Sequence, residues 1–127
     1  MALHNLIGKE GEQAARDYLV TKGFTVRESN WRMKRLEIDL IAEKDMVLHI
    51  IEVKTRDVAD VADFDPMEAV DVAKQRRLIA AANAYIGYWE LDHEIVYDVM
   101  VIVADKQNGT FDIELFPEAF YPLLRTF

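Results

Sequence analysis

Apolar and small side chains recur every three or four positions along the N-terminal segment of the chain. Between Ala2 and Lys22 they are Leu3, Ile7, Gly11, Ala14, Ala15, Tyr18 and Leu19. This spacing places them on one face of an α-helix. Gly23 follows at once, and glycine commonly stands just past the C-terminal end of a helix. The pattern therefore predicts an amphipathic helix over residues 2–22.

Three short segments after this helix are rich in β-branched and aromatic residues, which favours strands. They are Phe24–Trp31, Leu36–Glu43 and Met46–Arg56. The short gap between the last two predicts an antiparallel hairpin with a tight turn at Lys44-Asp45. In the third segment both faces begin apolar, which predicts a central strand.

The second half of the chain begins with an acidic stretch that is expected to form a loop. Residues 57–66 hold four Asp and no basic residue. Either Asp65 or Pro66 is expected to open a helix that starts at Met67 and runs to about Tyr88, because Asp caps helices and Pro fits their first turn.

Two further strands and a final helix are expected after this second helix. Residues 94–104 are apolar on both faces, which predicts a buried strand. Asn108-Gly109 is a hairpin turn signal that leads into a last strand at 111–116. A short helix is expected from Pro117.

This order of elements, α-β-β-β-α-β-β, predicts an α/β fold with a central mixed β-sheet flanked by helices. The connection from the third strand through the second helix to the fourth strand predicts that these two strands are parallel. With 127 residues, the chain fits one domain over 1–127.

Charged side chains emerge at the end of an otherwise apolar row in the third strand. Leu48 and Ile50 share one strand face, and the next two residues on that face are Glu52 and Lys54. A strand face that simply met solvent would carry polar residues along its whole length. From spacing alone, a structural ion pair between Glu52 and Lys54 is as good an interpretation as a functional site.

The predicted hairpin brings a second carboxylate to this row. A two-residue loop at Lys44-Asp45 places Asp39 opposite Ile50 and makes it a diagonal neighbour of Glu52, with the backbones about 7–8 Å apart. Two carboxylates and substrate phosphate oxygens are a ligand set that suits Mg²⁺, or Mn²⁺ in its place. The metal would activate water for phosphodiester hydrolysis, and Lys54 would orient that water or hold developing negative charge.

At this point the residues resemble a known family. Asp39 followed by Glu52-Val53-Lys54 resembles the PD-(D/E)xK pattern of the type II restriction endonuclease-like fold. More specifically, motifs spread over roughly residues 8–103 resemble the YraN-like family, whose members are predicted endonucleases. These motifs are Gly8-Lys9-Glu10-Gly11-Glu12, Ala15, Leu19, Gly23-Phe24, Asn30-Trp31-Arg32, Glu37-Ile38-Asp39-Leu40-Ile41, Glu52-Val53-Lys54-Thr55-Arg56, Lys74-Gln75-Arg76-Arg77-Leu78 and Tyr97-Asp98-Val99.

The resemblance implies a restriction endonuclease-like fold and a metal-dependent endonuclease that hydrolyses DNA phosphodiester bonds, in branched or otherwise processed DNA. The family is similar to archaeal Holliday-junction resolvases, which would assign Glu12 as a further catalytic and metal-binding residue beside Asp39 and Glu52. Two positions depart from the family pattern. Leu36 stands where Gly is usual, and Val96 stands where Arg is usual, so substrate contacts are less secure than the fold.

Several basic and polar residues are candidates for contacts with nucleic acid, although such clusters are commonly just solvated charge. They are Lys74, Gln75, Arg76, Arg77, Arg56 and Arg32. The net charge of −8 argues against phosphate binding. However, residues 1–56 hold 10 basic and 9 acidic side chains, whereas residues 57–127 hold 5 and 14, so the acidity belongs to the second part.

The content of Cys and His limits the possible metal cofactors, and the lack of targeting and membrane-spanning signals bears on the cellular location. The chain has no Cys, which excludes thiolate metal sites, and its three His are too scattered for a zinc site. Neither a signal peptide nor a run of roughly 18 apolar residues is found, so a cytoplasmic protein without a membrane partner is expected.

Alternative functions follow from the same sequence. One is a noncatalytic nuclease-fold module that binds nucleic acid or a DNA-processing partner. Another is a protein-interaction domain that uses the acidic segment 57–71. A two-fold homodimer would supply paired sites for cutting two strands.

Overall fold

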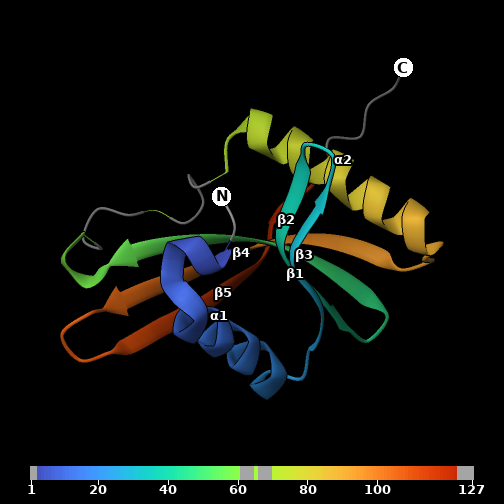
Figure 1. Ribbon diagram of the computed structural model, residues 1–127. Coiled ribbons are helices and arrows are strands. Elements are labelled where there is room, and N and C mark those ends of the chain that lie inside the picture. Colours follow the sequence, from blue (N-terminus) through green and yellow to red (C-terminus); the bar gives the residue numbers. More distant parts are fainter. Residues whose placement is uncertain (1–2, 61–64, 66–69, 123–127) are drawn as a thin grey trace.

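The computed structural model describes residues 3–60, 65 and 70–122. Five strands form one mixed sheet in the order β1-β2-β3-β4-β5, with α1 on one face and α2 on the other (Figure 1). The helices are α1 (Leu3–Thr21), the short 3₁₀ turn η1 (Val58–Asp60) and α2 (Val72–Trp89). The strands are β1 (Thr25–Met33), β2 (Leu36–Lys44), β3 (Val47–Asp57), β4 (Glu94–Asp105) and β5 (Thr110–Phe120). The predicted α/β fold and its element order are confirmed.

Strand pairing agrees with the predicted connections. β3 and β4 pair in parallel, as the crossover through α2 requires, and the other neighbouring strands pair antiparallel. β3 is the third of the five strands, which confirms that it is central.

The apolar residues of the strands divide into two clusters, one beneath each helix. On the α2 side, strand residues such as Leu48 and Ile50 pack with Leu78 and Tyr85. On the α1 side, strand residues such as Ile51 pack with the helix residues Ala15 and Leu19. A sheet covered on both faces explains why β3 and β4 read as nearly continuous apolar runs.

Two glycines shape α1, one at a kink inside the helix and one just past its end. Gly8 lies at φ 71°, where the helix is kinked, and Gly23 lies at φ 91° just after its end. These left-handed conformations carry no steric penalty in glycine. Past Gly23, the Phe24 backbone N–H donates to the carbonyl oxygen of Leu19 at 2.9 Å, which closes the helix as predicted.

The start of α2 differs from its predicted start. The helix begins at Val72, and Asp71 is the N-cap, whose side chain accepts a hydrogen bond from the Lys74 N–H at 2.8 Å. Residues 70 and 71 are not helical, so the prediction of Asp65 or Pro66 as the opening residue is wrong. Residues 66–69, including the predicted first residue Met67, lie outside the described part of the chain.

Two other boundaries also differ. β3 continues through Asp57 and η1 follows it, so the first residues of the predicted loop at 57–66 are regular structure. The helix expected from Pro117 is wrong at its start, because residues 117–120 remain in β5. An irregularity in the β4–β5 ladder between Tyr97 and Val99 accommodates Pro117 without ending the strand.

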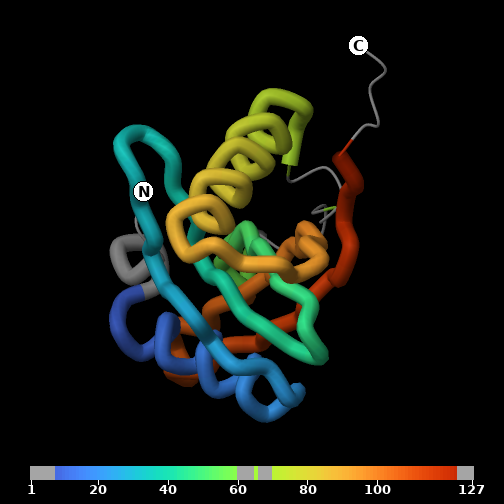
Figure 2. The backbone as a smooth tube through the Cα atoms, turned by 90° about the vertical axis from the view of Figure 1, so that its right-hand side faces the viewer, coloured from blue at the N-terminus to red at the C-terminus, as the bar shows by residue number. Residues whose placement is uncertain are grey.

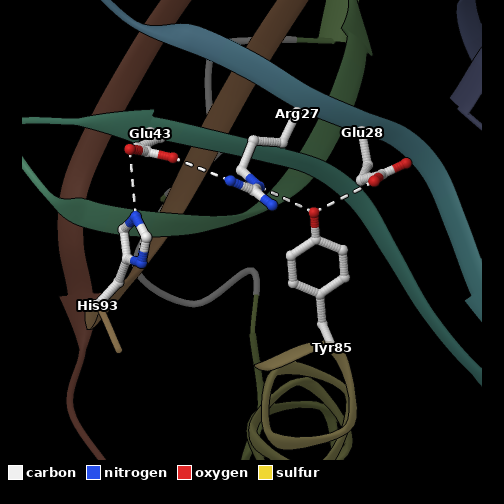
Figure 3. A network of polar contacts seen from close by, with 5 residues as sticks. All are labelled: Arg27, Glu28, Glu43, Tyr85 and His93. Atoms are coloured by element: carbon white, nitrogen blue, oxygen red, sulfur yellow. Dashed lines mark hydrogen bonds and ion pairs between the residues drawn. The ribbon is translucent and has the colours of Figure 1, made fainter. Parts of the chain in front are cut away.

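A polar network fastens α2 to β1 and β2 (Figure 3). The Tyr85 hydroxyl accepts from Arg27 Nε at 2.9 Å and donates to a Glu28 carboxylate oxygen at 3.1 Å. Glu43 accepts from Arg27 Nη1 at 3.0 Å and lies 3.1 Å from Nε2 of His93. Burial raises the pKa of the Tyr85 phenol, so the hydroxyl keeps its proton and remains a donor.

Tyr85→Phe is expected to lower the free energy of unfolding by about 1–2 kcal/mol, because it removes an oxygen that joins Arg27 to Glu28. Urea unfolding at neutral pH measures this change. Tyr88→Phe is the matched control on the same helix, because the Tyr88 side chain is 65% exposed. Equal stability of the two variants would contradict the importance of the network.

Candidate active site

The β2–β3 hairpin sets the register on which the site depends. Its two loop residues are Asp45 and Met46, with φ of 52° and 64°, and Lys44 pairs with Val47. Positive φ at both loop positions is typical of a two-residue type I′ turn. The loop predicted at Lys44-Asp45 is therefore wrong by one position. Neither Lys44-Asp45 nor Asp45-Met46 is the usual Asn-Gly turn sequence, so the sequence offers no signal that favours the correct pair.

This correction shifts the pairing by two residues and leaves the strand faces unchanged. Ile41, rather than Asp39, lies opposite Ile50, and the ladder continues to Leu40 opposite Ile51. One further step along the same register would put Asp39 opposite Glu52 instead of diagonal to it, and the two side chains interact directly. Because side chains alternate with a period of two, a two-residue shift keeps both carboxylates on one face.

The backbone ladder ends at this point and an Asp39 side-chain oxygen continues it. Asp39 Oδ2 accepts a hydrogen bond from the Val53 backbone N–H at 2.8 Å. Burial in β2 also loses its alternation here, since Ile38 packs on the α2 side whereas Leu40 packs on the α1 side. The strand is therefore irregular at Asp39, and its carboxylate replaces a backbone partner for β3.

The two carboxylates lie in one pocket of about 240 Å³ between β2, β3 and α2. Eight residues line it: Glu37, Asp39, Glu52, Val53, Lys54, Thr55, Arg56 and Lys74. Asp39 and Glu52 are only 7% and 5% exposed, yet both reach this open pocket. The structure therefore brings together the Asp39, Glu52 and Lys54 that the sequence predicts.

Two lysines from different elements neutralise Glu52. Its Oε2 lies 3.3 Å from Lys74 Nζ and 3.6 Å from Lys54 Nζ. The sequence suggests Lys74 only as a nucleic-acid contact, so its direct place in the pocket is a new finding. The available signal is its helical position four residues before the buried Leu78, which puts Lys74 on the face of α2 that meets the sheet.

The two carboxylates of the pocket disfavour each other's ionised form. Burial, followed by the negative charge of Glu52, raises the pKa of Asp39 to about 7. The hydrogen bond from Val53 opposes this rise, and the charge of Lys74 opposes it more weakly. A cation bound between the carboxylates would relieve the repulsion.

The predicted third carboxylate lies elsewhere. Glu12 does not line the pocket, and its Oε1 accepts from Asn30 Nδ2 at 3.3 Å. Among the residues that the structure describes, no three His, Cys, Asp or Glu side chains converge as a metal-binding group. The assignment of Glu12 to the site therefore stays a prediction of the family resemblance.

The predicted nucleic-acid contacts divide by position. Arg56 and Lys74 line the pocket, whereas Arg32 is 65% exposed with its Nε 3.5 Å from Glu37 Oε2. Gln75 instead donates from Nε2 to the carbonyl oxygen of Val70 at 3.1 Å. Two further candidates, Arg76 and Arg77, are exposed on α2.

The opposite sheet face carries a separate buried polar pair. His49 Nδ1 hydrogen-bonds the carboxylate of Asp98, which is fully buried and also accepts from the Glu118 N–H at 2.9 Å. His49 therefore faces away from Glu52. Val96 pairs with His49 in the β3–β4 ladder, so the departure from Arg at that position leaves the carboxylate pocket intact.

Leu36, the other departure from the family pattern, has a structural use. Its side chain packs against the core cluster beneath α2. Among the described helices, none is long and apolar enough to cross a membrane.

Fold and site thus define an α/β protein with a carboxylate pair and two lysines in one pocket. Residues 11–113 match the model of a family described as Uncharacterised protein family UPF0102, and the chain belongs to this family. A UPF0102 protein of Bacteroides fragilis is 43% identical over 124 residues, covering 98% of this chain and 99% of the relative. One of Bacteroides thetaiotaomicron is 42% identical with the same coverage, and one of Flavobacterium psychrophilum is 40% identical over 95% of this chain and 98% of the relative. The family description names no activity.

Proposed function

We propose that this protein is a Mg²⁺- or Mn²⁺-dependent endonuclease that hydrolyses phosphodiester bonds in DNA. The observation that carries the proposal is the pair Asp39 and Glu52, buried side by side yet open to one pocket. Lys54 occupies the place that the PD-(D/E)xK pattern gives to its lysine. The resemblance to the YraN-like family and the restriction endonuclease-like fold supports the same reaction.

The donor set of the pocket suits a hard divalent cation. Asp39 and Glu52 offer carboxylate oxygens, and Mg²⁺ commonly uses one or two carboxylates while keeping water and substrate phosphate oxygens as its other ligands. Such a cation supplies charge neutralisation of the phosphate and a lowered pKa of water. A closed zinc cage, in contrast, would need a larger set of protein ligands.

The side chains of the pocket have distinct parts in hydrolysis. Asp39 and Glu52 would hold the metal, Lys54 would orient the attacking water and Lys74 would balance the negative charge of the phosphate. The water oxygen bonds to phosphorus as the bond from phosphorus to the leaving oxygen breaks. The attacking water gives up a proton and the leaving oxygen gains one, so one water is consumed for each bond. Arg56, at the pocket wall, is placed to contact a substrate phosphate.

One observation favours a second candidate function, a module that binds nucleic acid without cutting it. Glu52 already has two lysine partners, at 3.3 and 3.6 Å, so the polar groups of the pocket are partly satisfied without a metal. In that case Glu52, Lys54 and Lys74 form a structural ion network. The two lysines would bind nucleic-acid phosphates, and the carboxylates would hold the lysines in position.

A cleavage assay separates these two functions. Duplex, nicked, flap and four-way DNA are incubated with Mg²⁺ or Mn²⁺, and Lys54→Ala is compared with Lys106→Ala. We expect Lys54→Ala to slow cleavage by roughly 10²–10³-fold, because it removes a positive charge at the reacting phosphate. The Lys106 side chain is 85% exposed and lies outside the pocket, so Lys106→Ala should retain full activity.

Two results would contradict the proposal. Unchanged cleavage by Lys54→Ala would remove the site assignment. Salt-dependent DNA binding by the unaltered protein, with no hydrolysis in either metal, would select the noncatalytic module.

A further inference from the structure

The tip of the β1–β2 hairpin concentrates positive charge. Arg32, Lys34 and Arg35 fall within four consecutive residues, and all three are exposed. No acidic residue lies between Asn30 and Leu36, although the chain as a whole carries a net charge of −8. This cluster, the hairpin cations, is therefore an exception to the overall acidity.

The turn itself is unusual for its residues. Met33 pairs with Leu36, so Lys34 and Arg35 form a two-residue loop, and Lys34 has φ of 55°. Asn or Gly is the usual residue at positive φ in such loops. A lysine in this conformation costs on the order of 1 kcal/mol, and its side chain is exposed at the hairpin tip. A role in binding explains a lysine at this position better than a role in folding does.

The β1–β2 hairpin packs against α2, which fixes its position. The Trp31 ring packs edge-on against the Tyr85 ring, with 5.3 Å between centroids, and Leu36 packs against the core under α2. The hairpin and α2 rise from the same side of the sheet and lie side by side, as the two views show (Figures 1 and 2). Packing on both strands therefore holds the tip in place.

The candidate active site lies between the tip end of the hairpin and the first turn of α2. Glu37, one residue past the start of β2 and close to the hairpin tip, and Lys74 in the first turn of α2 both line the pocket. Arg35 is two residues from Glu37, or about 7 Å along a strand. Arg77 is three residues from Lys74, or about 4.5 Å along a helix. A nucleic-acid strand advances about 3.4 Å of helix axis per nucleotide, so these spacings correspond to roughly one or two nucleotides from the pocket.

We infer that the hairpin cations and the cations of α2 hold phosphates on opposite sides of the pocket, so that the protein engages an internal position of a polynucleotide strand. This inference rests on the proposed function and deepens it. A site that takes a strand end needs cations on one side only. Here the cations continue in both directions, with Arg32, Lys34 and Arg35 on one wall and Lys74 and Arg77 on the other.

Binding without divalent metal tests the hairpin independently of hydrolysis. A labelled blunt DNA duplex is titrated, in the presence of a chelator and at several salt concentrations, with the double variant Lys34→Ala/Arg35→Ala. The matched control, Lys22→Ala/Lys106→Ala, removes two exposed cations that lie outside the pocket. Thermal unfolding confirms that both variants are folded.

We expect the hairpin variant to bind at least about tenfold more weakly and to flatten the slope of log affinity against log salt by about 2, because each lost phosphate contact contributes about 0.9. The control should change neither quantity. Covalently closed circular DNA, which has no ends, should compete for the protein as well as the same mass of linear DNA.

The inference is overturned if the hairpin variant behaves like its control, or if closed circles fail to compete. These outcomes leave the hydrolytic proposal standing whenever the unaltered protein cuts DNA in Mg²⁺. Conversely, binding that depends on the hairpin, with no cleavage in any metal, supports the inference and removes the hydrolytic proposal.

Discussion

Glu52→Gln is expected to reduce metal-dependent DNA cleavage by roughly 10³-fold, equivalent to about 4 kcal/mol of transition-state stabilisation. The substitution keeps the size of the side chain and removes one of two carboxylate charges that we assign to the metal. It also leaves Lys54 and Lys74 without their shared anion, which adds positive charge to the pocket. A hard cation would then meet one carboxylate and two ammonium groups.

The same variant should lose its response to metal in the absence of DNA. Millimolar Mg²⁺ or Mn²⁺ should raise the thermal midpoint of the unaltered protein, because a ligand that binds only the folded state stabilises it. Glu52→Gln should show no such rise. Glu114→Gln, which removes an exposed carboxylate on β5, is the control that should respond like the unaltered protein. An equal midpoint shift in Glu52→Gln would show that the metal binds elsewhere.

Asp39→Asn is expected to stabilise the metal-free protein at alkaline pH by on the order of 2 kcal/mol while it abolishes cleavage. Burial and the neighbouring Glu52 raise the pKa of Asp39 to about 7, so ionising Asp39 costs free energy only in the folded state. The neutral amide avoids this cost. Its oxygen can still accept the hydrogen bond from the Val53 N–H.

The stability gained by Asp39→Asn is expected to depend on pH. Because the folded-state pKa lies above the ordinary value of 3.8, the folded state binds more protons, and stability falls as pH rises from about 4 to about 7. The advantage of Asp39→Asn should therefore be small near pH 4 and full above pH 7. Urea unfolding across this range measures it. A constant difference between the two proteins, or a loss of stability in the variant at pH 8, would contradict the raised pKa.

The sequence predicts the carboxylate pocket well because the pattern that indicates it lies within one strand and its neighbour. Glu52 and Lys54 interrupt an apolar row on one strand, and strand alternation alone places them together. Asp39 reaches them although its predicted register is wrong, because a shift by two residues preserves the face. A shift by one would have separated the two carboxylates.

Features that depend on tertiary contacts are harder to read from the sequence. The sequence predicts Asp65 or Pro66 as the opening residue, whereas the structure shows Asp71 as the N-cap of α2. Lys74 enters the pocket as a consequence of that helix start. Likewise, Pro117 suggests the end of a strand, but the irregular β4–β5 ladder carries β5 past it.

Glu12 illustrates the limit of a family resemblance. Its helical position agrees with a role near the sheet, yet its carboxylate accepts a hydrogen bond from Asn30 and stands outside the pocket. A role transferred through a motif thus needs the geometry of this chain to support it, whereas the pair on β2 and β3 has such support.

The hydrogen bond from Val53 to Asp39 gives this one side chain a place in the sheet in addition to the metal-binding role that we propose for it. Asp39→Ala would remove both the hydrogen-bond acceptor of the Val53 N–H and a negative charge of the pocket, so a loss of activity in that variant could result from a distorted sheet. Asp39→Asn, in contrast, removes the charge and keeps the acceptor. If the proposed hydrolysis is correct, relatives that have lost it should carry Asn at this position far more often than Ala.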